Sequence, residues 1–167
     1  MIVIICLANI DVRTMEMLDV VGVDDVWIES LLLTNPQVAE KGLCVIFDIA
    51  NYPWNMIKWF TPDRIKLSLK KMQSLPFKDY RFHFVNNATV IHAVIKIIWP
   101  FLPEHFKQMI KFHFDNRTSL FEHIDPKVLP LEYGGTNNLN YNELWSKLYD
   151  RNEEISSSFK LYRTVSI

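Results

Sequence analysis

Short apolar runs alternate with longer stretches of helical periodicity along this chain. Residues 3–7 and 43–49 are almost uninterrupted apolar runs, which are typical of strands buried on both faces. Residues 80–85 alternate aromatic and polar side chains, as a strand with one buried face does, and residues 110–114 form a further strand. Because helical stretches separate these runs, the pattern predicts an α/β domain in which helices cover a sheet.

The helical stretches have recognisable ends. Residues 14–33 carry apolar side chains on one side, although Gly22 weakens the middle of this helix. Thr61-Pro62-Asp63 begins another helix, because threonine supplies a capping oxygen, proline suits the first turn and aspartate favours the positive helix end. Residues 103–109 are predicted to form a short helix before the last strand.

Residues 90–99 are apolar on nearly every side if they are helical. Their only polar side chains are His92 and Lys96, which are four residues apart and share one narrow edge of a helix. The many β-branched residues would suit a central strand equally well, but a cap at Thr89 and a stop at Pro100 favour the helix. Such a helix must be buried, or must contact something apolar on the side away from the core.

Composition narrows the possible partners. The chain is 49% hydrophobic and 13% aromatic, which fits either a lined cavity or an aromatic-rich core. A net charge of −1 argues against nucleic acid as a partner. The two cysteines, Cys6 and Cys44, lie inside apolar runs, so a disulfide framework is excluded and a reducing, cytoplasmic compartment fits. No apolar run reaches the roughly 18 residues of a membrane span.

The motifs of the common enzyme classes are absent from the sequence. The four glycines form no phosphate-binding loop, and no G-x-S-x-G motif presents a serine. The five histidines show no metal-binding spacing, so structural or surface roles are favoured. Asp48, the only charge on its strand, is either a buried general base or a partner of nearby backbone groups, and the second role is favoured. We predict no enzymatic activity, no metal and no cofactor.

Four separated stretches occur in an order and at a spacing known from one family. They are GLCVIFDI at 42–49, Thr61-Pro62 followed by LPFK at 75–78, the set HFVN, VIHAV and PFL between 83 and 102, and LPLEYGG at 129–135. Together they resemble the lipid-binding domain of the CRAL-TRIO family, which includes alpha-tocopherol transfer protein and cellular retinaldehyde-binding protein. The family normally carries a helical domain ahead of this one, and we expect it to be missing here.

The resemblance implies a mixed, mostly parallel sheet that floors a hydrophobic pocket roofed by helices, one of which is a mobile gate. Residues 1–135 would form this domain, and residues 136–167 a C-terminal amphipathic helix with a polar, partly mobile tail over residues 152–158 and beyond. The expected gate residues are Val90, Ile91, Val94, Ile95, Ile98 and Phe101. The expected ligand-binding residues are Phe47, Ile49, Ile65, Leu69, Met72, Phe77, Phe82, Phe84, Val94, Ile98 and Phe101.

The implied function is binding and intracellular transfer of a small hydrophobic lipid such as a tocopherol, retinoid or carotenoid. The gate would swing out at a membrane, so the protein would be cytoplasmic and transiently membrane-associated. Some family members also bind phosphatidylinositol bisphosphate. Here only Lys78, His105 and Lys107 are candidates for a headgroup site, which leaves that activity open. The alternative function is an interaction or membrane-surface module whose cavity is filled or incomplete.

Overall fold

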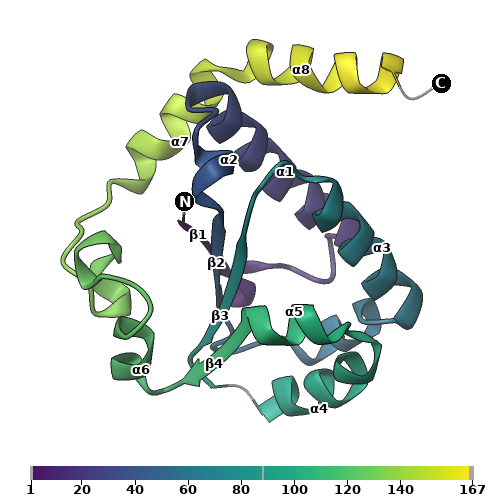
Figure 1. Ribbon diagram of the computed structural model, residues 1–167, viewed down its shortest axis with the longest axis vertical. Coiled ribbons are helices and arrows are strands. Elements are labelled where there is room, and N and C mark those ends of the chain that lie inside the picture. The colour runs from purple at the N-terminus through teal and green to yellow at the C-terminus, as the bar shows by residue number, and fades with distance from the viewer. Residues whose placement is uncertain (1, 88, 166–167) are drawn as a thin grey trace.

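The fold is described from a computed structural model that covers residues 2–87 and 89–165. Its centre is a sheet of four strands in the order β1-β2-β3-β4 (Figure 1). All three strand pairs in this part of the chain are parallel, so each connection crosses over one face of the sheet. The α/β class and all four predicted strands are confirmed, with these bounds: β1 Ile2–Cys6, β2 Leu43–Asp48, β3 Tyr80–Val85 and β4 Ile110–Phe114.

The helices begin and end largely where the sequence signals predict. Thr61 caps α3, its hydroxyl oxygen accepting a hydrogen bond from the Arg64 backbone N–H at 3.4 Å. Residues 90–99 are helical rather than part of the sheet, and a 3-10 turn, η3, continues them. The α-helices are α1 Met17–Thr34, α2 Val38–Lys41, α3 Pro62–Ser74, α4 Thr89–Ile98, α5 Glu104–Met109, α6 Arg117–Phe121, α7 Tyr141–Asp150 and α8 Asn152–Val165. The 3-10 helices are η1 Leu7–Asn9, η2 Trp54–Trp59, η3 Trp99–Phe101, η4 Pro126–Val128 and η5 Leu131–Tyr133.

The sheet has two differently covered faces. The front face, which carries Phe47 and Phe84, packs against α1, α4 and η2. The rear face carries Ile46 and Val85. It packs against α6 and the segment that leads through η5, which together we call the rear cover. Figure 1 shows the sheet nearly edge-on, with α1, α3, α4 and α5 on one side and α6 and α7 on the other.

The C-terminal segment differs from the prediction. We expected residues 152–158 to be a mobile polar tail, but they form the first half of α8. Arg151, at the junction of α7 and α8, donates to the Ser30 carbonyl oxygen at 3.0 Å and also to the Thr34 hydroxyl, and so satisfies groups at the end of α1. Ile155 is only 3% exposed. The contacts that order this segment therefore come from α1, far away in the sequence. Residues 166–167, the end of the predicted tail, lie outside the described residues.

Two glycines with opposite surroundings allow a test of the rear cover. A Cβ at Gly135 would lie 1.9 Å from the Leu129 carbonyl oxygen, whereas nothing lies within 4 Å of one at Gly22 in α1. We expect Gly135→Ala to lower the free energy of unfolding by more than about 2 kcal/mol, because the backbone must move apart. Gly22→Ala should raise it by about 0.5–1 kcal/mol, because alanine favours a helix. Urea unfolding measures both, and equal effects would contradict the described loop.

Candidate functional site

Aromatic rings form a continuous row across the front face of the sheet. Parallel pairing aligns Phe47 of β2 with Phe84 of β3, and Phe84 with Phe112 of β4. Their ring centroids are 4.9 Å apart for the first pair and 5.1 Å apart for the second, with the rings stacked. Phe82, one step along β3, lies 6.4 Å from Phe47. We call Phe47, Phe82, Phe84 and Phe112 the aromatic floor.

The aromatic floor is less completely covered than the opposite face. Its rings remain partly exposed although three of the four lie on the two inner strands, β2 and β3. On the rear face of the same strands, Ile46 is 0% and His83 is 1% exposed. Side chains on an inner strand are normally sealed by the layer that packs on them. The front helices therefore leave part of the surface of these four residues accessible.

Helix α4 packs an apolar side on the core and exposes both polar and apolar side chains. Its buried side chains, Val90, Ile91 and Val94, pack into the cluster that contains Ile49 and Tyr52. Ile95 and Ile98 are partly buried against the same cluster. On the other side, Ile97 is 38% exposed, and Phe101 of η3 is 43% exposed. These two apolar side chains share the outer surface with the exposed polar residues His92 and Lys96.

Within the described residues, α4 is held by apolar packing alone. None of its side chains makes a hydrogen bond or an ion pair there, and its one ring contact places His92 5.5 Å from the ring of Phe114. Apolar contacts have no preferred direction, so another apolar surface can replace them without leaving a buried polar group unpaired. The helix can therefore exchange its environment more easily than one held by directional bonds.

The structure brings most of the predicted ligand-binding residues together. Phe47, Ile49, Phe84, Val94 and Ile98 share the cluster beneath α4, and Phe77 and Phe82 share a neighbouring one with Phe47. In this part of the chain, neither cluster includes the three predicted residues of α3: Ile65, Leu69 and Met72. Ile65 is buried, and the other two are partly buried.

Sequence reasoning missed Phe112 as a floor residue. It lies on β4 in register with Phe84, and the ring of Trp99 in η3 is 6.1 Å away. The alternation of residues 110–114 held the necessary signal, because every second side chain of a strand faces the same way.

The candidate headgroup residues do not form a concentrated positive site. Lys78 and His105 are exposed, and the His105 ring lies 4.6 Å from that of Phe106. Lys107 is partly buried, forms an ion pair with Glu104 at 3.2 Å, and lies 5.8 Å from the centre of the Trp99 ring. The ion pair compensates one of the two lysine charges and so weakens the attraction for a phosphate group.

Asp48 joins the carboxyl ends of three strands. Its Oδ2 accepts a hydrogen bond from the Tyr133 hydroxyl at 2.9 Å. Its Oδ1 accepts from the Asn86 side-chain amide at 2.7 Å and from the Ala50 backbone N–H at 3.0 Å. The sulfur of Cys6, at the end of β1, lies 3.2 Å from the same hydroxyl. Burial, together with hydrogen bonds to Cys6 and Asp48, raises the pKa of Tyr133 far above its usual value. The backbone partner predicted for Asp48 is confirmed, and the carboxylate is committed to holding strands together.

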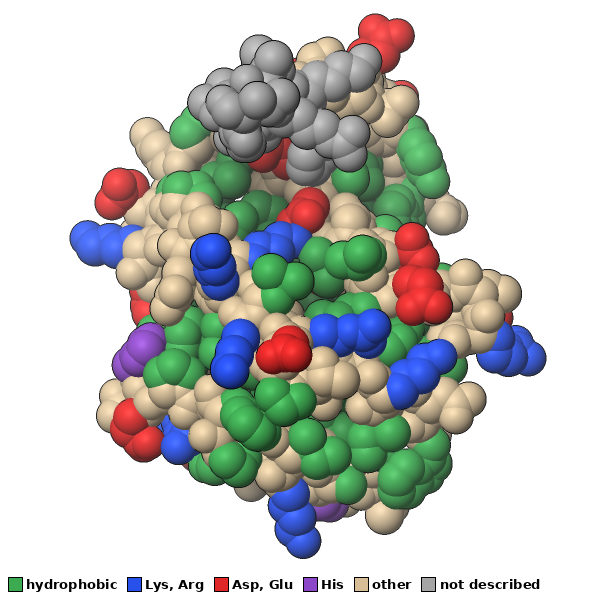
Figure 2. All heavy atoms as spheres, turned by 90° about the vertical axis from the view of Figure 1, so that its right-hand side faces the viewer, with side chains coloured by type: hydrophobic (Ala, Val, Ile, Leu, Met, Phe, Trp, Pro, Cys, Tyr) green, Lys and Arg blue, Asp and Glu red, His purple; other side chains and the backbone are tan. Residues whose placement is uncertain are grey.

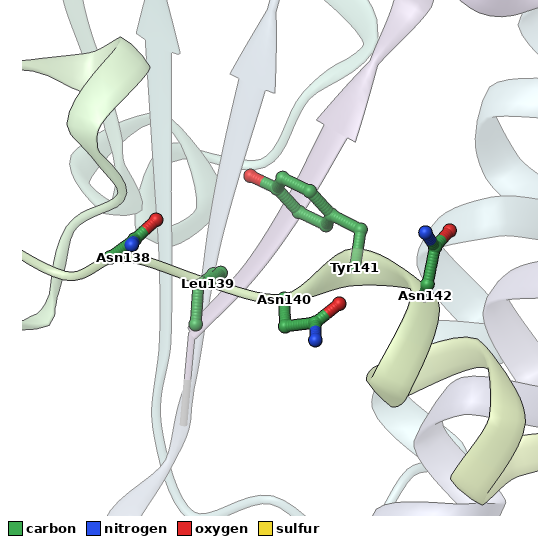
Figure 3. A pocket seen from close by; sticks show the side chains of 5 residues that line it. All are labelled: Asn138, Leu139, Asn140, Tyr141 and Asn142. Atoms are coloured by element: carbon green, nitrogen blue, oxygen red, sulfur yellow. The ribbon is translucent and has the colours of Figure 1, made fainter.

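A surface recess of about 470 Å³ lies away from this face. Figure 3 shows that five successive residues, Asn138, Leu139, Asn140, Tyr141 and Asn142, line it. Asn140 is occupied in capping α7, its side-chain oxygen accepting from the Glu143 backbone N–H at 3.2 Å. A recess formed by one segment has no opposing wall to enclose a ligand. It is therefore not our candidate site.

The described residues also limit other kinds of site. Among residues 2–87 and 89–165, no group of three or more His, Cys, Asp or Glu side chains is placed to hold a metal ion. No helix in that part of the chain has both the length and the apolar character needed to cross a membrane.

The fold and this face define an α/β protein whose parallel sheet carries a partly exposed aromatic floor beneath its front helices. The model of the CRAL/TRIO domain matches residues 1–135. Clavesin-2 from Mus musculus and clavesin-2 from Homo sapiens are each 30% identical over 135 residues, which is 80% of this chain and 41% of the relative. Clavesin-1 from Rattus norvegicus is 35% identical over 107 residues, which is 64% of this chain and 30% of the relative. The chain thus spans less than half the length of these relatives.

The chain therefore belongs to the CRAL/TRIO family, whose members are lipid-binding and lipid-transfer proteins. The sequence resemblance is confirmed.

A pair of tyrosines tests the structural role of Asp48. Tyr133→Phe should lower the free energy of unfolding by about 2 kcal/mol, because one oxygen of a partly buried carboxylate loses its donor. Tyr141 also donates to a carboxylate, that of Glu132, but its side chain is exposed. Tyr141→Phe should therefore change the stability by less than about 0.5 kcal/mol. Chemical denaturation measures both variants, and a Tyr133→Phe protein as stable as the parent would rule out this role.

Proposed function

We propose that this chain binds one small hydrophobic lipid over the aromatic floor and releases it at membranes when α4 moves aside. The observation that carries the proposal is the partial exposure of Phe47, Phe82 and Phe84 on inner strands. An apolar guest over these rings would remove them and itself from water, at about 25 cal/mol for each Å² of apolar area. Such binding is non-covalent and needs no catalytic group.

The shape of the ligand follows from the walls. Flat aromatic rings and branched aliphatic side chains suit a molecule with an extended hydrocarbon part, such as a tocopherol, retinoid or carotenoid. The membership of the CRAL/TRIO family supports the lipid class. We propose that the ligand also contacts Phe77, which packs with Phe47 and Phe82, and the α3 side chains Ile65, Leu69 and Met72.

The exposed side of α4 supports a membrane encounter. Further exposed apolar side chains belong to neighbouring elements: Trp54 of η2, which contacts α4, is 60% exposed, and Leu67 of α3, which contacts η3, is 62% exposed. Figure 2 shows apolar side chains gathered over the lower part of this face, below a band of lysine and arginine side chains. An apolar surface edged by cations suits the interface of a bilayer.

The cations of α3 favour anionic lipid as the docking surface. Arg64, Lys66 and Lys70 are exposed, and none has an ion pair within the described residues. We propose that they orient the protein at a charged bilayer. Recognition of a particular phosphoinositide by Lys78, His105 and Lys107 has less support, because Lys107 is paired with Glu104.

A filling substitution tests the space above the floor. Phe84→Trp adds ring volume there, so we expect uptake of the apolar dye Nile red to fall about tenfold while the free energy of unfolding changes by less than about 1 kcal/mol. Phe121→Trp, at a partly buried ring on the rear face, should leave uptake unchanged. If the floor is solidly packed, the parent protein takes up no dye and Phe84→Trp is destabilised instead by about 1–3 kcal/mol. That result would favour the interaction module over the carrier.

Two matched charge insertions test the membrane contact. Phe101 and Val128 are 43% and 49% exposed on opposite sides of the sheet. Phe101→Glu should slow transfer of Nile red between phosphatidylcholine vesicles about tenfold, because a carboxylate disfavours entry into the interface. Val128→Glu should transfer the dye at the parent rate. Equal rates for the two variants would show that α4 and η3 do not enter the bilayer.

A further inference from the structure

Two buried histidines form a hydrogen-bonded chain on the rear face. His83 of β3 is 1% exposed and His113 of β4 is 4% exposed. The Nδ1 of His83 lies 2.8 Å from the Nε2 of His113, and the Nδ1 of His113 lies 2.7 Å from the Ser119 hydroxyl of α6. The remaining ring nitrogen, Nε2 of His83, is buried and has no partner among the described residues. The chain thus joins two strands to the rear cover and ends in an unpaired nitrogen.

The position of His113 depends on an irregularity in β4. Phe84 pairs with Phe112 and Val85 with Phe114, so His113 is an extra residue between two paired ones. Phe114, which follows it, has φ of +48°, a left-handed conformation that costs a non-glycine residue about 1–3 kcal/mol. β-Bulges of this kind re-aim a side chain and are frequent beside functional sites.

This bulge also touches α4. Phe114 lies on the front face, packed in the cluster beneath α4, and its ring is 5.5 Å from that of His92. A change in the His83–His113 pair would therefore act on the backbone that positions Phe114. The β4 bulge therefore connects the protonation of His113 on the rear face with the packing of Phe114 under α4 on the front face.

The surroundings of the pair disfavour any added proton. Burial lowers the pKa of His83 to about 4, and electrostatic interactions with His113, His123, Arg81 and Lys111 act in the same direction. Burial likewise lowers the pKa of His113, with Glu122 as the one opposing charge. The ring of His123, after α6, lies 5.6 Å from the His83 ring. Both buried imidazoles are therefore neutral at pH 7.

We propose that His83 and His113 form an acid-sensitive latch, which holds the rear cover and the bulge in place when neutral and loosens α4 when protonated. The effect on α4 rests on the gate role proposed above. The neutral pair needs only one shared hydrogen. A second proton places a positive charge between the strands, where no carboxylate accepts from either ring in the described structure. Loosening of the rear cover lets water solvate that charge, and the irregular turn at Phe114 carries the change to the packing of α4.

The direction of the pH effect follows from the depressed pKa. Above pH 6.5 both the closed and the open forms hold a neutral His83, so the latch is fully closed. Between pH 6.5 and about 4 the open form binds the proton and the closed form does not, so acid favours opening. For His83 alone, the opening equilibrium should be roughly 20-fold larger at pH 5 than at pH 7.

The Ser119–His113 contact does not require an enzyme. In a serine hydrolase the histidine holds a nucleophile towards a substrate and is itself oriented by another group. Here Ser119 belongs to a helix packed on the rear face, while the aromatic floor lies on the other side of the sheet. A latch accounts for the hydrogen bonds from His83 through His113 to Ser119, for the bulge in β4, and for the unpaired Nε2 of His83.

Hydrogen exchange of the full chain without lipid tests the latch. At pH 5, with rates corrected for intrinsic exchange, we expect peptides covering β4 and α4 to lose protection roughly 20-fold relative to pH 7. His83→Gln keeps a side-chain donor towards His113 but cannot titrate, so most of this acid response should disappear. Ser119→Ala keeps both imidazoles and should weaken protection at pH 7 while retaining the response. An undiminished response in His83→Gln overturns the proposal.

Two further measurements separate the possible failures. In the parent protein, the ring-nitrogen NMR signals of His83 should remain those of a neutral imidazole at pH 5. A His83 ring that titrates at pH 6 or above overturns the latch. This measurement does not depend on whether the His83→Gln variant folds. Loss of protection confined to β4 overturns its link to α4. Nile red uptake reads the carrier function separately: absent uptake with an intact acid response removes the carrier and leaves the latch.

Discussion

The structure depends on an unequal covering of the two faces of one parallel sheet. Inner strands of such a sheet are buried on both sides, which is why their residues form apolar runs. On the rear face of this sheet the middle of the inner strands is sealed: Ile46 is 0% and His83 is 1% exposed. On the front face, large rings stack along the strands and keep part of their surface. The same strands thus carry buried side chains on the rear face and partly exposed aromatic side chains on the front face.

Polar groups fix the arrangement of the rear cover at the carboxyl ends of the strands. Asp48 accepts from Tyr133 and Asn86, so a segment more than eighty residues away is fixed at the ends of β2 and β3. Gly135 then lets the chain pass against the Leu129 carbonyl oxygen, closer than any side chain would permit. Buried carboxylates stabilise a fold only when their oxygens are paired, and such pairing also selects one arrangement over others. The proposed movement of α4 therefore concerns the front of the molecule, where no such polar contacts hold the helix within the described residues.

The sequence predicted those features that depend on local pattern. The four strands, the cap at Thr61 and the helical state of residues 90–98 follow from apolar periodicity and from the ends of each run. The helix over residues 152–158 was not predicted, because it gains from distant partners: Ile155 is buried, and the nearby Arg151 binds the end of α1. Polarity alone could not reveal those partners.

The candidate site was predictable in part for the same reason. Phe47 and Phe84 could be placed on one face by alternation, but their stacking depends on strand register, which one sequence does not specify. The meeting of His83 with His113 depends on register and on a bulge as well. No spacing within either strand predicts it. Interactions between elements are the part of the site that only the fold provides.

The contrast between the two faces explains why α4, rather than another helix, should be the part that moves. Moving α6 would break the hydrogen bond of Ser119 to His113 and would uncover a buried nitrogen. Moving α4 exposes only apolar surface, and acyl chains are as apolar as the side chains that it would leave. At a membrane the cost of exposing Val90, Ile91 and Val94 to water therefore largely disappears. In water that cost remains, and under the proposed function it would keep the helix closed. The same apolar packing can thus hold the helix shut in solution and let it open at a bilayer.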